Sequence, residues 1–246
     1  MHVTSEQRHD DGVVERELIL GDIPGTLWTP ASAEPVPLIL MAHNNALPKC
    51  EPRLVARARH TAAAGYAVAS IDAFGCGDRS RTEAQQLARA EFRRGMQAGP
   101  TDDVLESYTG PLVAGAVPDW RTTLDALLTL PEIGGPVGYS GWLALGIGLA
   151  AVEPRIAAAG FFAGGYVPRT QREAARQVTI PLLVLLQWDD AGNPRQRALD
   201  LFDAFGSTEK TLHANLGGHV GTPWFELEDG ERFFDRHLRG SGPSLH

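Results

Sequence analysis

Three uninterrupted apolar runs, each ending in polar residues, most constrain the fold of this chain. They occupy residues 37–43, 66–71 and 180–186, and the segments between them have helical composition. A continuous apolar run is expected for a strand buried on both faces of a parallel sheet, whereas a strand with one solvated face alternates. The chain is therefore predicted to form an α/β fold with a mostly parallel central sheet flanked by helices.

Length and composition fit a single domain at residues 1–246. The hydrophobic share is 43%, enough for a sizeable core. A net charge of -8 without any basic block argues against nucleic acid as a partner. Cys50 and Cys76 make no disulfide framework, and the polar start has no signal-peptide core, so we expect a cytoplasmic protein. No apolar run is long enough for a membrane span, and a homo-oligomer is left open.

The remaining elements follow from turn and helix signals. Residues 1–12 are predicted as a loose polar start, and residues 13–20 and 23–29 as a hairpin. Residues 82–117 carry no strand pattern and are predicted as a helical insertion that caps the site. A further helix is expected to begin at Pro118. Helices are also predicted at residues 53–64, 171–176, 194–205 and 224–238, and strands at 155–162 and 209–213.

A candidate nucleophile lies in residues 135–142, Gly-Pro-Val-Gly-Tyr-Ser-Gly-Trp. A short strand pattern runs into Ser140, and a helix-forming run follows at once. Strand, sharp turn and helix form the context of a nucleophile elbow, so Ser140 is predicted to stand exposed at the carboxyl end of the strand. An ordinary turn with Ser140 as a helix cap is the alternative interpretation.

The chain order of Ser, Asp and His supports a catalytic triad. Ser140, Asp190 and His219 each follow a predicted strand, and carboxyl ends of parallel strands meet at one edge. His219 would accept the serine proton, and Asp190 would orient the imidazole. Asp189 competes for that role, but a spacing of four residues to Pro194 favours Asp190.

Other residues complete the predicted site. An oxyanion hole needs two backbone N–H donors, expected from Gly141 and from Asn44 or Asn45. The substrate pocket is predicted to be lined by Trp142, His43 and Phe74.

The sequence resembles the α/β-hydrolase superfamily, close to its dienelactone-hydrolase-like and small bacterial esterase branches. The resemblance is carried by Met-Ala-His-Asn-Asn-Ala-Leu-Pro-Lys49, Asp-Ala-Phe-Gly-Cys-Gly-Asp-Arg79, Gly-Tyr-Ser140, Gln-Trp-Asp-Asp190 and Gly-Gly-His219. It implies a small carboxylic ester or lactone as substrate, cleaved through an acyl-enzyme without a cofactor or metal.

Several positions depart from the pattern of these relatives. Asn44 and Asn45 replace a glycine pair, Trp142 replaces the second elbow glycine, and Cys76 stands where relatives often carry His. Some relatives read G-Y-x-G-x-S-x-G, which would put Leu143 at the nucleophile position; ungapped spacing downstream favours Ser140. A lyase, a cyclase, a C–C bond-cleaving enzyme or an inactive ligand-binding protein are the alternatives on this scaffold.

Overall fold

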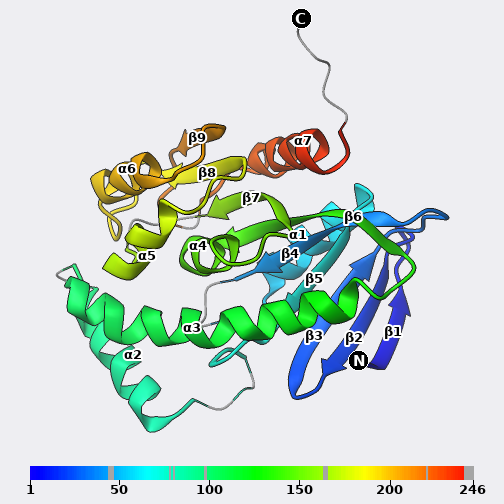
Figure 1. Cartoon of the computed structure of the whole chain (residues 1–246), viewed down its shortest axis with the longest axis horizontal. Coiled ribbons are helices and arrows are strands. Elements are labelled where there is room, and N and C mark those ends of the chain that lie inside the picture. Colours follow the sequence, from blue (N-terminus) through cyan, green and yellow to red (C-terminus); the bar gives the residue numbers. More distant parts are fainter. Residues whose placement is uncertain are drawn as a thin grey trace, which may run out of the picture.

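A nine-stranded sheet runs through the molecule between two layers of helices (Figure 1). This computed structural model describes residues 1–43, 47–77, 79, 81–96, 99–162, 166–219 and 221–240. In spatial order the strands are β1 (His2–Arg8), β2 (Val14–Leu20), β3 (Ile23–Thr29), β5 (Ala67–Ile71), β4 (Val36–Ala42), β6 (Ile133–Trp142), β7 (Ile156–Phe162), β8 (Leu182–Gln187) and β9 (Lys210–Asn215). Every pair from β5 to β9 is parallel, which confirms the predicted fold class.

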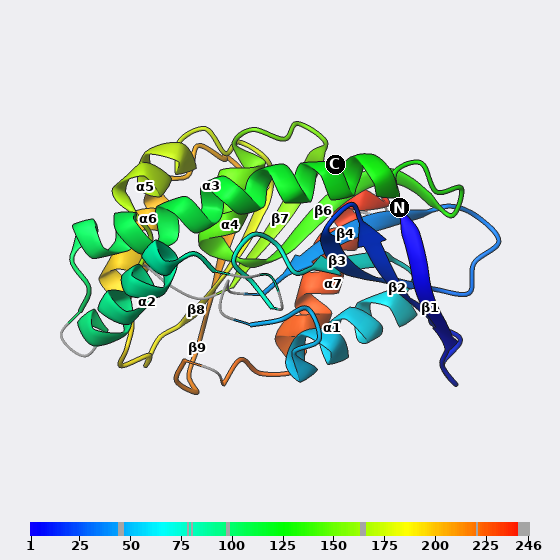
Figure 2. The same cartoon turned by 90° about the horizontal axis from the view of Figure 1, so that it is seen from below.

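The helices divide between the two faces of the sheet (Figure 2). They are α1 (Pro52–Ala63), α2 (Glu83–Gly95), α3 (Asp102–Leu127), α4 (Leu143–Ala150), α5 (Arg169–Ala175), α6 (Arg195–Ala204) and α7 (Phe225–Leu238). Helices α1 and α7 cover one face, and α3 to α6 cover the other. Within β4 the neighbours Ile39 and Leu40 are both fully buried, one in each layer, which explains the uninterrupted apolar run.

The first residues form a strand, so the prediction of a loose polar start is wrong. Strand β1 pairs antiparallel with β2, although all seven of its side chains are exposed. Backbone pairing at the sheet edge creates it, and such pairing leaves no apolar pattern in the sequence.

Helix α3 runs unbroken through Pro111 and Pro118. The prediction that a new helix begins at Pro118 is therefore wrong. An internal proline costs about 3 kcal/mol, but α3 buries Val113, Ala116 and Trp120 against the sheet layer, and this burial holds the helix together. Helix α2 packs on α3, with the Phe92 and Tyr108 rings stacked at 4.6 Å. That residues 82–117 cap the site stays a prediction.

Among the described residues, no helix is both long and apolar enough to cross a bilayer.

Candidate active site

The structure brings Asp190 and His219 together at the carboxyl edge of the sheet. Asp190 follows β8 and His219 follows β9, and His219 Nδ1 lies 2.7 Å from Asp190 Oδ2. The Asp190 side chain is 3% exposed and its other oxygen accepts a bond from Gly192 N at 2.9 Å. The His219 side chain is 62% exposed. A buried carboxylate thus fixes the ring through Nδ1, and no hydrogen bond to another described residue engages Nε2.

Asp189, unlike Asp190, bonds to the backbone of the loop before His219. Its carboxylate accepts backbone bonds from Gly217 N at 3.0 Å and Gly218 N at 2.8 Å. These bonds, that from Gly218 first, hold the pKa of Asp189 below its ordinary value. Gln187 Nε2 donates to Gly218 O at 2.9 Å from the other side. Both side chains fix the loop that carries His219, so the alternative of Asp189 as the partner of His219 is not what the structure shows.

Ser140 does not stand exposed at the tip of a turn, and that prediction is wrong. It lies inside β6, paired with Met41 on one side and Gly160 on the other, and is 4% exposed. Its Oγ accepts a hydrogen bond from Arg57 Nη2 at 3.0 Å. Among the described residues, no hydrogen bond joins Ser140 to His219. The hydroxyl faces the layer of α1 and α7 and lines a small cavity beside Phe162 and Phe234.

The turn itself is two residues further along the chain. Strand β6 continues to Trp142, and α4 begins at Leu143. Gly141 pairs with Ala42 and Phe161 in the ladder, so it too lies within the strand rather than in the turn. Trp142 is the N-cap of α4, half-buried against the core, and gives no side-chain capping bond. Neither Trp142 nor Leu143 carries a nucleophilic atom.

Arg57 is the residue of this region that the sequence analysis missed. Its guanidinium lies 4.1 Å from the centre of the Phe162 ring, and burial lowers its pKa to about 10. Its Nε is buried without a hydrogen-bond partner, and no carboxylate in the described part of the chain pairs with it. A signal existed in the sequence. Arg57 follows Leu54 by three residues and precedes Thr61 by four, which places it on the buried face of α1.

The remaining predicted residues lie at several places. Asn44 and Asn45 fall outside the described residues. His43 follows β4, with Nε2 3.7 Å from Glu51 Oε2. Phe74 packs on Gly115 of α3, where a methyl group would come within 2.2 Å of its ring, and its N donates to Asp119 Oδ2 at 2.7 Å.

Comparisons with known proteins give a fold and relatives by structure. No family model matches the chain, and no curated protein matches it significantly. A cold-adapted esterase from an Arctic intertidal metagenomic library superposes with a TM-score of 0.78 at 26% identity, covering 97% of this chain and 100% of that one. An acetyl xylan esterase from Paenibacillus sp. R4 gives 0.70 at 16% identity, covering 96% and 88%.

A third structure shares the fold at still lower sequence identity. A protein assigned as a dienelactone hydrolase from Klebsiella pneumoniae superposes with a TM-score of 0.65 at 13% identity, covering 92% of this chain and 98% of that one. At such low identity the last two matches establish the fold alone. The shared fold and the match at 26% identity show that this chain is similar to esterases.

Proposed function

Because the chain has the α/β-hydrolase fold and resembles esterases of that superfamily, we propose that it hydrolyses a small carboxylic ester or lactone. The observation that carries the proposal is the 2.7 Å contact of His219 and Asp190 at the carboxyl edge of the sheet. A buried carboxylate that orients an exposed imidazole is the acid–base half of a hydrolase site.

His219 acts as a general base in this proposal. With Nδ1–H donating to Asp190, Nε2 holds a lone pair, and the exposure of the ring allows water to reach it. The water oxygen attacks the carbonyl carbon while its proton passes to Nε2. The imidazolium then returns the proton to the departing oxygen, so that an acid and an alcohol leave, or an opened lactone. General-base catalysis of this kind contributes about 10²–10⁴-fold.

The developing oxyanion needs donors, and the start of α4 supports that role. Among the described residues no side chain caps α4, so no cap from them binds the N–H groups of its first turn, which begins at Leu143. Such a helix start also carries partial positive charge. Gly141 and the loop of Asn44 and Asn45 remain proposed donors from the sequence.

Two nucleophiles are compatible with this base. An acyl-enzyme on Ser140 would require Arg57 to withdraw and the hydroxyl to reach His219. Attack by water requires neither movement. The location of Ser140 inside β6 therefore favours water in this chain.

Hydrolysis of a p-nitrophenyl ester series tests the proposal. We expect turnover by the wild type, a loss of about 10²-fold or more in kcat/KM for His219→Ala and Asp190→Asn, and little change for Ser140→Ala. A fluorophosphonate probe would then leave Ser140 unlabelled. Labelling of Ser140, together with an inactive Ser140→Ala, would replace water by the acyl-enzyme. A folded wild type without turnover and without labelling would refute hydrolysis of these esters.

A second candidate function is non-catalytic ligand binding, favoured by Trp142 and Leu143 at the position of the elbow. Ligand binding without catalysis would be indicated by an ester that raises the melting temperature of the protein and is recovered intact. Product analysis of the same sample separates the two candidates.

A further inference from the structure

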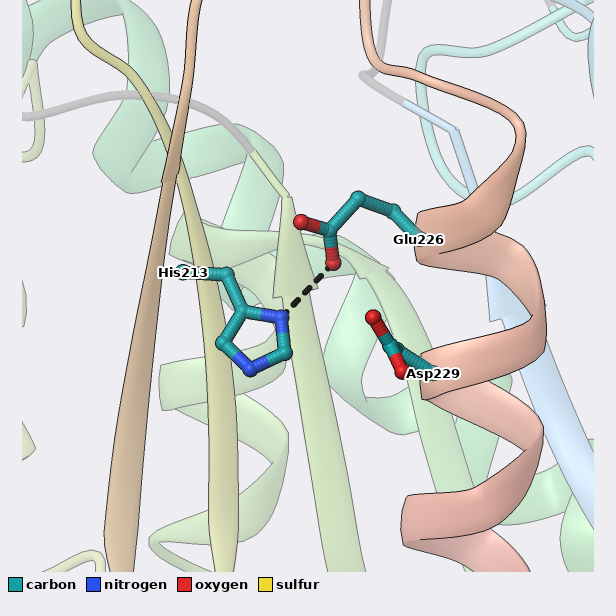
Figure 3. A group of neighbouring side chains, drawn as sticks. All are labelled: His213, Glu226 and Asp229. Carbon is teal, nitrogen blue, oxygen red and sulfur yellow. Dashed lines mark hydrogen bonds and ion pairs between the residues drawn. The ribbon is translucent and has the colours of Figure 1, made fainter.

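A second histidine–carboxylate group lies between β9 and α7 (Figure 3). His213 comes from β9, and Glu226 and Asp229 come from the same face of α7, three residues apart. His213 Nδ1 lies 2.8 Å from Glu226 Oε2. One potential ligand atom from each of the three side chains lies within 4.8 Å of the others, and in the part of the chain that is described no other group of three His, Cys, Asp or Glu residues does so.

The charge of this group is poorly balanced. Glu226 is 2% exposed, and its second oxygen accepts a bond from the neutral amide of Asn215 at 2.6 Å. Asp229 adds a second carboxylate, whose ion-pair partner, Arg232, has a side chain that is 64% exposed. Two carboxylates thus converge beside one imidazole, and a buried carboxylate is costly unless a positive charge compensates it.

We propose that His213, Glu226 and Asp229 bind a divalent transition metal ion, Zn²⁺ in the first instance. Imidazole nitrogen and carboxylate oxygen are ligands that Zn²⁺ takes, and three protein ligands leave a fourth position for water. The ligand atoms are His213 Nδ1, Glu226 Oε2 and one carboxylate oxygen of Asp229. Binding through Nδ1 requires that this nitrogen carry no proton, so the remaining ring proton is on Nε2 in the metal-bound state. Arg232 releases Asp229 to the ion.

Such an ion would join the last helix to the last strand of the sheet. Strand β9 is at the edge of the sheet, and within the described residues β8 is the one strand that pairs with it. A ligand from β9 and two from α7 cross-link these elements in the folded state alone, so metal stabilises the fold in proportion to its free concentration. Asn215 keeps Glu226 oriented by its bond to Oε1, as outer partners of metal ligands do. The inference is independent of ester hydrolysis.

Titration of the chelator-treated full chain with ZnSO₄ tests the site. We expect one ion per chain by calorimetry, a melting temperature that rises with Zn²⁺, and visible d–d absorption when Co²⁺ is used instead. His213→Ala and Asp229→Asn should each weaken Zn²⁺ binding at least tenfold. Asp229 is half-buried, so its variant is expected to fold even if changes at the buried Glu226 do not.

Two controls separate this site from other histidines. His60 Nε2 lies 3.1 Å from Glu231 Oε1, but this pair belongs to no group of three ligands, so His60→Ala should leave the affinity for Zn²⁺ unchanged. The same is expected of His219→Ala. No Zn²⁺ binding by the folded wild type, or binding that survives His213→Ala and Asp229→Asn, would overturn the proposal.

Discussion

Replacing Arg57 by Met is predicted to stabilise the protein, although it removes a hydrogen bond. The guanidinium is turned inward toward Ser140 and Phe162 and has no carboxylate partner among the described residues. A charge taken out of water without a counter-charge opposes folding. Methionine keeps the unbranched stem that packs under the sheet and carries no charge.

The magnitude follows from the pKa of Arg57. Burial lowers it to about 10, against an ordinary value of about 12.5. At about 1.4 kcal/mol per pKa unit, the charged form costs at most about 3 kcal/mol in the folded state. This cost is present at pH 7, below both pKa values, and falls only as the pH rises above about 10. Met loses about 1 kcal/mol of hydrogen bond and about 1 kcal/mol of ring contact. The net gain is about 1 kcal/mol.

Urea unfolding at pH 7 measures this difference, and a thermal melt should show a rise of about 2–4 °C. Arg59→Met is the matched control on the same helix, because Arg59 pairs with Asp11 at 3.0 Å and both side chains are 38% exposed. That control should lose up to about 1 kcal/mol. If Arg57→Met lost more than 1 kcal/mol, the guanidinium would have to be compensated, and the reasoning about its charge would be refuted.

Three further predictions concern the turn and the sheet. Gly141→Ala should cost about 3 kcal/mol or more in urea unfolding, since φ is +149° and a methyl group would lie 2.0 Å from a backbone oxygen of β4; Gly230→Ala, with open space, should cost nothing. Hydrogen bonds from arginine, that of Arg155 first, lower the pKa of Glu153 to about 2. Its contribution to the free energy of unfolding, up to about 3 kcal/mol, is therefore present above pH 4.5 and lost as the pH falls toward 2. The difference in stability between the wild type and Glu153→Gln should vanish over that range. Leu143→Ser should become labelled by a fluorophosphonate probe, and adding His219→Ala should abolish the labelling. Loss of the buried leucine should lower the free energy of unfolding by about 2–4 kcal/mol. Labelling of the double variant would contradict this prediction.

The architecture could be predicted because each buried strand carries its own local signal. Ile39 and Leu40 are apolar on both faces of β4, and glycine at residue 65, with φ +96°, ends α1. Strand β1 could not be found this way, since exposed side chains leave only backbone pairing to define it. The prolines of α3 misled for the opposite reason. A strong local signal at Pro118 was overridden by burial on the sheet, which the sequence does not display.

The contact of Asp190 with His219 in the candidate site could be predicted from the sequence for a similar reason. Asp190 and His219 follow short, well-marked strands, and parallel strands bring their ends together. The hydrogen bonds of Asp189 to Gly217 and of His213 to Glu226 arise only in three dimensions, because they join groups that are 28 and 13 residues apart in the chain. The choice between two adjacent carboxylates does have a local signal, because the spacing to Pro194 favours Asp190, which is the one that faces His219.

The position of Ser140 shows why a motif does not by itself locate a nucleophile. The end of a strand is set by its neighbours, and β6 is extended to Trp142 by pairing with Phe162 of β7. Each strand residue advances about 3.3 Å, so Ser140 lies roughly 7 Å short of that end. Adjacent strand residues face opposite sides of the sheet, and Tyr139 packs in the layer of α3 and α4, so the hydroxyl of Ser140 is directed toward the layer of α1, where Arg57 meets it. A shift of two or three residues thus separates a nucleophile from a buried hydroxyl, while the contact of His219 with Asp190 at the edge is unaffected. The proposal of water as the nucleophile follows from this position, because attack by water requires no movement of Ser140 or Arg57.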